Sequence, residues 1–146
     1  MADEPLSNRA VETIRLGHAW FNSLDRRPDF DVSSAFSEDF VCEDRKTGGV
    51  SFGLMNASEY LAALQSNWDV GRQSPSFVIH RVIAVRGDRL AAVDESVDFD
   101  DMVIHGATVW KLDSSLTRWQ RIVSFDIDDV DAAVAELERM YAEIDD

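Results

Sequence analysis

The change in hydrophobic periodicity near Ser76 constrains the fold of this chain most strongly. Before this residue apolar side chains recur at helical spacing, and after it they alternate with polar ones. Three long alternating segments follow, at residues 77–86, 89–99 and 102–112, and a fourth lies at 119–125. Alternation at a spacing of two is typical of strands with one buried face, so the second half of the chain predicts a long antiparallel sheet.

Short polar links join the first three alternating segments. Gly87-Asp88 and Asp100-Asp101 are short enough for two-residue hairpin turns, although Asp-Asp is a poorer pair for primed turns than Asn-Gly. A two-residue turn at Asp100-Asp101 places Glu95 opposite Gly106 in the facing strand. A shift of one residue would move every side chain of the strand to the other face.

Helical periodicity predicts three helices before the sheet. Ser7 is a suitable N-cap for a first helix that runs to about Leu24, and residues 32–36 are long enough for only a short second helix. Asn56, with Glu59 three residues later, resembles a capping box that opens a third helix. These helices are expected to cover the apolar face of the sheet.

A closing helix follows the last strand. Asp126 and Asp128 precede its first turn, where Asp suits both N-capping and the positive end of the helix dipole. We therefore interpret these acids as residues that start a helix rather than residues that move protons. The expected apolar stripe of this helix comprises Val130, Val134, Leu137, Tyr141 and Ile144.

The order of helices, then strands, then a helix indicates an α+β fold with helices packed on one face of a curved sheet. A chain of 146 residues with 45% hydrophobic content is about one domain long. We expect a disordered leader at residues 1–6 and a single domain at 7–146. Cys42 is the only cysteine, and its apolar neighbours predict a small buried hydrophobe rather than a nucleophile.

Charge and hydropathy exclude several classes of partner. The chain carries 14 basic and 28 acidic residues, a net charge of −14, which repels phosphate backbones and anionic lipid surfaces. We therefore expect no nucleic-acid partner. The sequence has neither a run of 18 apolar residues nor a basic segment followed by an apolar one, so we expect no membrane span, no secretory signal and a cytoplasmic location.

Three runs of residues carry a resemblance to a known family. They are Glu43-Asp44-Arg45-Lys46, Arg86-Gly87-Asp88-Arg89-Leu90-Ala91 and the nine residues from Phe125 to Ala133. With the element order, they resemble the nuclear transport factor 2-like superfamily, also called SnoaL-like, over nearly the whole chain. The resemblance is closer to an actinobacterial branch whose domains are often appended to large regulatory proteins. It implies a cone, with an apolar pocket between the concave sheet and the first and third helices, and a homodimer through the outer sheet face.

Glu95 is the best single candidate for a catalytic acid or base. The expected pairing makes it the only charged residue on a face that otherwise carries apolar or small side chains, and the facing Gly106 leaves space for a ligand. The structural alternative is a glutamate that pairs with an arginine or faces an outer interface. Asp44 and Arg45 are adjacent and point to opposite faces of a strand, so they cannot both line one pocket. Arg45 is therefore interpreted as a salt-bridging residue.

The histidines are assessed separately. His18 lies on the inward stripe of the first helix and is a candidate pocket residue, with a hydrogen-bonded core histidine as the alternative. His105 is expected on the outer face, at a dimer interface or partly exposed, and His80 on a strand face with Val78, Val82 and Ala84. The three are scattered and lack metal-ligand spacing with Cys42 or the acids, so the sequence predicts no metal and no cofactor.

The aromatic residues supply material for an apolar pocket wall. The candidate ligand-binding residues are His18, Phe21, Tyr60, Trp68, Glu95 and Trp110. Such walls imply a small apolar ligand. The sequence favours a ligand-binding or regulatory accessory domain over an enzyme, because no pair of ionisable residues can be placed together in the pocket. The alternatives are a cofactor-free lyase, isomerase, dehydratase or cyclase that uses Glu95 with His18 or Tyr60, and a pure dimerisation module.

Overall fold

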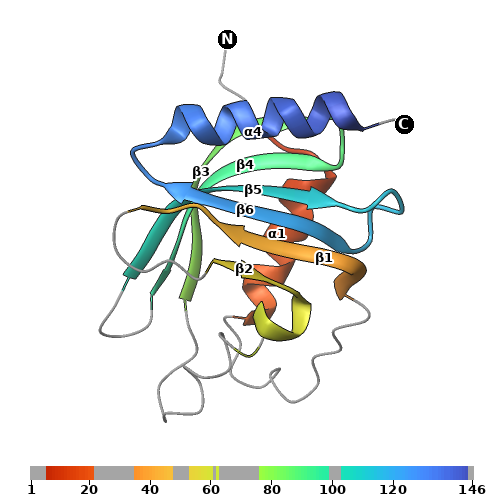
Figure 1. The fold of residues 1–146 in the computed structure, drawn as a ribbon, viewed down its shortest axis with the longest axis horizontal. Coiled ribbons are helices and arrows are strands. Elements are labelled where there is room, and N and C mark those ends of the chain that lie inside the picture. The colour runs from red at the N-terminus through yellow and green to blue at the C-terminus, as the bar shows by residue number, and fades with distance from the viewer. Residues whose placement is uncertain are drawn as a thin grey trace.

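A computed structural model describes residues 6–21, 35–47, 53–60, 62, 76–98 and 103–144 (Figure 1). The described elements, in chain order, are α1 (Arg9–Phe21), β1 (Phe36–Asp44), β2 (Leu54–Met55), β3 (Ser76–Arg86), β4 (Leu90–Asp98), β5 (Val103–Leu112), β6 (Trp119–Asp126) and α4 (Val130–Glu143). Within these ranges no helix is long and apolar enough to cross a membrane. The four strands expected from the alternating pattern are confirmed.

The described strands form one six-stranded sheet in the order β2-β1-β6-β5-β4-β3. The meander of β3 to β6 is antiparallel, as expected. The sheet as a whole is mixed, because β1 pairs with β6 in parallel. This strand begins at Phe36, inside the short helix expected for residues 32–36, and the segment 31–34 lies outside the described residues.

The register between β4 and β5 agrees with the expected one. Glu95 pairs with Gly106 and Ser96 pairs with His105, so Glu95 and His105 lie on opposite faces of the sheet. The proposed turn at residues 100–101 lies outside the described residues. At the other hairpin Arg86 pairs with Leu90, so the connection has three residues rather than the two expected, with Gly87 at a φ of 55°.

The two long helices cover opposite faces of the sheet, which corrects the expectation of helices on one face. One core cluster joins α1 to the concave inner face, through residues such as Ile14, Val93 and Trp110. A second cluster joins α4 to the outer face, through Leu90, Val109 and Leu137 among others. Figure 1 shows α4 running beside β4, in nearly the direction of β4, β5 and β6, while α1 crosses behind the strands. The outer cluster takes Leu90 and Ala92 from the first half of β4. The outer face is therefore covered only in part.

The N-cap of the first helix differs from the one that the sequence predicts. Asn8, not Ser7, caps α1, because its Oδ1 accepts a hydrogen bond of 2.9 Å from the Val11 backbone N–H. The capping box is confirmed: Asn56 N–H donates to Glu59 Oε1 at 3.0 Å, and Glu59 N–H donates to Asn56 Oδ1 at 2.9 Å.

The start of α4 is also different. Asp129 occupies the N-cap position without a side-chain hydrogen bond to the helix. The Asp126 carboxylate instead accepts hydrogen bonds from the backbone N–H and hydroxyl of Thr47, at 2.9 and 2.7 Å. Asp126 therefore holds the loop after β1 in place and does not cap α4. The buried stripe of α4 is Ala133, Glu136, Leu137 and Met140, whereas the expected Tyr141 is 48% exposed.

Two interpretations of single residues in and after β1 are confirmed. Cys42 is buried, and burial raises the pKa of its thiol to about 12. Arg45 forms ion pairs with Glu43 at 2.5 Å and with Glu136 of α4 at 2.9 Å. Arg45 thus connects the end of β1 to the helix on the outer face.

Candidate functional site

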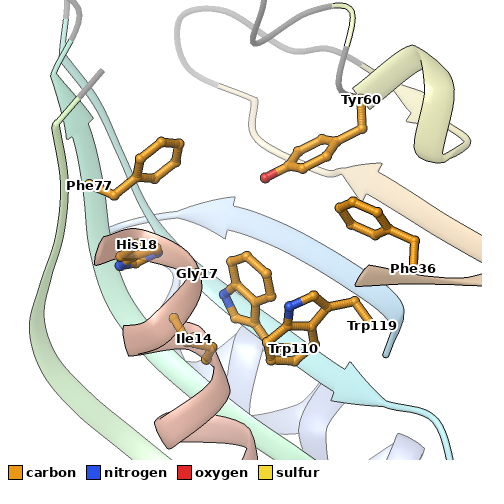
Figure 2. A pocket seen from close by; sticks show the side chains of 8 residues that line it. All are labelled: Ile14, Gly17, His18, Phe36, Tyr60, Phe77, Trp110 and Trp119. Carbon is orange, nitrogen blue, oxygen red and sulfur yellow. The ribbon is translucent and has the colours of Figure 1, made fainter. Parts of the chain in front are cut away.

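An apolar hollow lies between α1 and the concave face of the sheet. Its lining residues are Ile14, Gly17, His18, Phe36, Tyr60, Phe77, Trp110 and Trp119 (Figure 2). They come from α1, from β1, β3, β5 and β6, and from the short helical turn at residue 60. The room inside is about 30 Å³, which accommodates one or two water-sized groups. A ring-containing ligand therefore requires lining side chains to turn aside.

A buried carboxylate and a buried imidazole meet at the wall of this hollow. Glu95 Oε2 and His18 Nε2 are 3.0 Å apart, and the two side chains are 13% and 9% exposed. The other carboxylate oxygen, Oε1, accepts a hydrogen bond of 2.8 Å from the indole N–H of Trp110. The sequence paired Glu95 with His18 or Tyr60 in the enzyme alternative, and the fold brings Glu95 and His18 into contact.

The contact leaves hydrogen-bonding capacity unused. Among the described residues, neither His18 Nε2 nor Glu95 Oε2 makes an aligned hydrogen bond, although both atoms are buried. Buried polar atoms without an aligned hydrogen bond are uncommon in folded proteins. The 3.0 Å ion pair compensates only in part for the hydration that these two atoms lose. A polar group placed beside these two atoms would satisfy both.

Aromatic rings fix the position of His18. Its ring stacks on Phe77 with centroids 5.1 Å apart and meets the edge of Trp110 at 6.3 Å. These contacts leave the imidazole little freedom to rotate, and Figure 2 shows it on the α1 side of the hollow. The arrangement presents one ionisable pair, held by its surroundings, to an otherwise apolar space.

Tyr60 lies across the hollow from His18, and its hydroxyl points toward the open space (Figure 2). The residue packs on the core through its contacts with Phe36 and Phe40, and burial raises the pKa of its phenol well above the ordinary value. The phenol is therefore protonated at neutral pH and offers a hydrogen-bond donor to an acceptor in the hollow.

Four of the six candidate ligand-binding residues from the sequence lie at this site. His18, Tyr60 and Trp110 line the hollow, and Glu95 contacts two of them. The side chains of Phe21 and Trp68 lie outside the described residues. Sequence reasoning missed Phe36, Phe77 and Trp119, whose apolar character fits any core position and gives no separate signal.

Solved structures share this architecture. A Delta 5-3-ketosteroid isomerase from a Mycobacterium species superposes with a TM-score of 0.59 at 12% identity, over 85% of this chain and 97% of that one. A protein of unknown function with a cystatin-like fold from Methylobium petroleophilum gives 0.59 at 16% identity, over 84% and 78% of the two chains. A de novo designed protein with the NTF2 fold gives 0.51 at 17% identity, over 92% and 97%.

These similarities define the fold class. The chain has the nuclear transport factor 2-like fold, an α+β cone, as the sequence resemblance implied. No family model matches the chain, and no curated protein matches it. The narrower resemblance to appended actinobacterial domains stays a prediction. At these identities the likeness carries fold alone, so function must be argued from the site.

Proposed function

We propose that the chain binds a small, largely apolar ligand that places one polar group against His18 and Glu95. The observation that carries this proposal is the pair of buried polar atoms, His18 Nε2 and Glu95 Oε2, which lack aligned hydrogen bonds at the wall of an apolar hollow. Stability does not account for them, because a buried ion pair is often no better than apolar packing. Ionisable groups with such surroundings in a cavity are typical of binding sites.

The shape and polarity of the hollow restrict the ligand. Among its eight described lining residues, polar side-chain atoms come from His18, Tyr60 and the indole N–H groups of Trp110 and Trp119, and the Trp110 N–H already donates to Glu95. A compatible ligand has an apolar body and one oxygen or nitrogen that reaches His18, with a second acceptor available to the Tyr60 hydroxyl. Sugars and nucleotides, which need many hydrogen bonds, do not fit these walls.

A thermal-shift screen tests ligand binding. Wild type, Glu95→Gln and the control Glu12→Gln are screened against steroids, polyketide-like aromatics, terpenoid epoxides and fatty acyl compounds. Glu12 is exposed on the same helix as His18, so its variant removes an equal charge away from the hollow. We expect a ligand that raises the melting temperature of wild type and of the control, and raises that of Glu95→Gln less. No stabilisation by any compound would favour the pure dimerisation module.

A second candidate function is a cofactor-free lyase, isomerase, dehydratase or cyclase. The observation that favours it is the 3.0 Å approach of Glu95 to His18, since proton-transfer enzymes require an acid or base and a second polar group together. The sequence alone places no ionisable pair in the pocket, whereas Glu95 and His18 form one in the folded chain. Product analysis of each screening hit distinguishes the two functions: turnover that is lost in Glu95→Gln identifies an enzyme, whereas binding without turnover identifies a sensor or accessory domain.

We further propose a homodimer through the outer sheet face in the cytoplasm. Val78 and Val103 are 43% and 60% exposed on the part of this face that α4 leaves open, and apolar exposure of this kind is typical of interfaces. Sedimentation of the Val103→Glu variant tests the proposed dimer. The control is Leu16→Glu, which changes an exposed side chain of α1. We expect the first variant to be monomeric and the control to remain a dimer. A monomeric wild type would contradict the proposal.

A further inference from the structure

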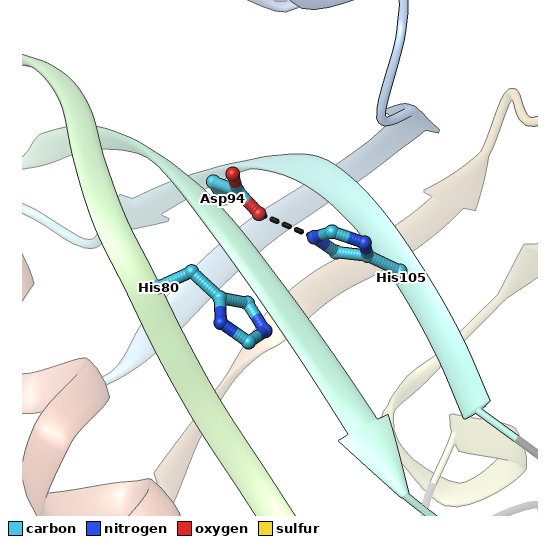
Figure 3. Close-up of side chains that lie close together, drawn as sticks. All are labelled: His80, Asp94 and His105. Atoms are coloured by element: carbon cyan, nitrogen blue, oxygen red, sulfur yellow. Dashed lines mark hydrogen bonds and ion pairs between the residues drawn. The ribbon is translucent and has the colours of Figure 1, made fainter.

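His80 and His105 lie far apart in the sequence but close together on the outer face of the sheet. His80, Asp94 and His105 belong to the neighbouring strands β3, β4 and β5 (Figure 3). Each offers a ligand atom, and these atoms all lie within 4.8 Å of one another. This cluster faces away from the hollow that contains Glu95, because Asp94 and Glu95 are successive residues of one strand.

A bulge in β3 lies at His80, which shares the outer face with Val78 two residues earlier. Ile79 pairs with Glu95 and Arg81 pairs with Asp94, so His80 is an extra residue in the ladder. Because of this extra residue Val82 pairs with Val93 and joins the inner core. A second irregularity follows at residues 82–84. The expectation that His80 shares a face with Val78 and Ala84 is confirmed, but the expectation for Val82 is wrong.

The side chains of this cluster lie close enough to one another to bind one metal ion after small rotations. His105 Nε2 lies 2.5 Å from Asp94 Oδ1, and the rings of His80 and His105 are 5.0 Å apart. His80 Nε2 is 2.8 Å from the Ser96 hydroxyl. Zinc bound tetrahedrally at about 2.1 Å holds its ligand atoms about 3.4 Å apart. Both histidines are exposed, so small side-chain rotations can bring the ligand atoms to that separation.

We propose that His80, Asp94 and His105 bind a divalent first-row transition cation such as Zn²⁺ or Ni²⁺. Two imidazoles with one carboxylate suit these cations, whereas Mg²⁺ and Ca²⁺ prefer sites built from oxygen ligands. Three protein ligands also leave at least one coordination position open to water or to another ligand. The expectation of no metal was based on spacing along the chain, and residues on adjacent strands of a sheet have no fixed spacing.

Charge around the cluster both favours and opposes a cation. The net charge of −14 attracts cations to the molecule. Arg81 Nε lies 3.7 Å from Asp94 Oδ2, and its positive charge competes with a metal for this carboxylate. The Arg81 side chain is 60% exposed in the single chain and can move away from Asp94 when a metal binds.

Zinc titration of the full chain against a chromophoric chelator tests the site. We expect one Zn²⁺ per wild-type chain and no competition from excess Mg²⁺. His80→Ala and His105→Ala are expected to weaken binding by at least about tenfold, because each removes a ligand and even the loss of an outer partner of a ligand costs about 10- to 100-fold. Arg81→Gln is expected to tighten binding, because it removes the competing charge.

Asp94→Asn and Asp98→Asn form a matched pair that separates a site from diffuse attraction to an acidic surface. Both aspartates lie on β4, and each variant removes one negative charge. We expect only Asp94→Asn to weaken zinc binding by about tenfold. Equal affinity in both histidine variants and wild type, or equal losses in the two aspartate variants, would overturn the inference. Circular dichroism confirms that each variant is folded.

Discussion

At the scale of single residues, Glu95 shows how an ionisable side chain is kept in an apolar wall. Its two carboxylate oxygens face Trp110 Nε1 and His18 Nε2, at 2.8 and 3.0 Å. Periodicity predicted the sheet face and the strand partner of Glu95, because both follow from alternation and hairpin register. The enzyme alternative named His18 as a possible partner of Glu95, but alternation could not choose between His18 and Tyr60, since the contact depends on how α1 crosses the sheet.

Trp110→Phe tests the hydrogen bond to Glu95. The variant retains an aromatic ring but removes the N–H donor, so one oxygen of a mostly buried carboxylate loses its partner. We expect the free energy of unfolding to fall by about 1–3 kcal/mol more than in the control Trp119→Phe. That control trims the same atoms from a neighbouring ring of the hollow and leaves the Glu95 bond in place. Urea denaturation measures both, and equal losses would contradict the role assigned to Trp110.

Cys42 provides a second test at this scale. Burial raises the pKa of its thiol to about 12, so at pH 8 the side chain is protonated as well as inaccessible. We expect a thiol reagent to label the native protein at least tenfold more slowly than the chain unfolded in urea. Labelling at the rate of the unfolded chain would show that the core around β1 is open.

At the scale of elements, Asn8 fixes α1 in two ways. Its Oδ1 caps the helix, and its Nδ2 donates to the backbone oxygens of Gly87 and Leu90, at 2.9 and 2.8 Å. These bonds join the start of α1 to the hairpin between β3 and β4. The position of His18, ten residues later on α1, therefore depends on this cap.

Asn8→Ala is expected to lower the free energy of unfolding by about 2 kcal/mol, because it removes the cap and the donor to the hairpin together. Ser7→Ala is the matched control and is expected to change the free energy of unfolding by less than about 0.5 kcal/mol. Chemical denaturation compares the two. A larger loss in Ser7→Ala would restore Ser7 as the N-cap.

Among the features of the sheet, only some could be predicted from the sequence. The strands and the register of β4 with β5 followed from alternation, which depends on neighbouring residues only. The bulge at His80 and the parallel pairing of β1 with β6 did not, because no local pattern marks an extra residue or a distant partner. The histidine cluster was missed because it joins three strands, whereas metal-ligand spacing was sought along the chain.

At the scale of the whole molecule, an ion-pair network connects the outer helix to the sheet. Glu136 of α4 is 5% exposed and pairs with both Arg45 and Arg139. Burial by itself would raise the pKa of Glu136, but hydrogen bonds from Arg139 and Arg45 outweigh it and hold the pKa below the ordinary value. Glu136 therefore stabilises the fold most when it is ionised.

This network predicts a dependence of stability on pH. A carboxyl with a lowered native pKa contributes fully above its unfolded pKa, near 4.3, and loses the contribution as the pH falls through the native value. We expect Glu136→Gln to be less stable than wild type by about 1–3 kcal/mol at pH 7, with a difference that shrinks below pH 4. Glu138→Gln, which removes an exposed partner of Arg86, should cost less than about 1 kcal/mol. A constant difference between wild type and Glu136→Gln at all pH values would contradict this account.

The fold places two distinct polar sites on opposite faces of one sheet, His18 with Glu95 inside and His80 with Asp94 and His105 outside. The most direct test of ligand binding at the inner site is the ¹⁵N spectrum of the three imidazole rings, recorded as the best ligand from the thermal-shift screen is added. The account predicts that the resonances of His18 shift, while those of His80 and His105 do not. Unchanged His18 resonances at saturating ligand would contradict it.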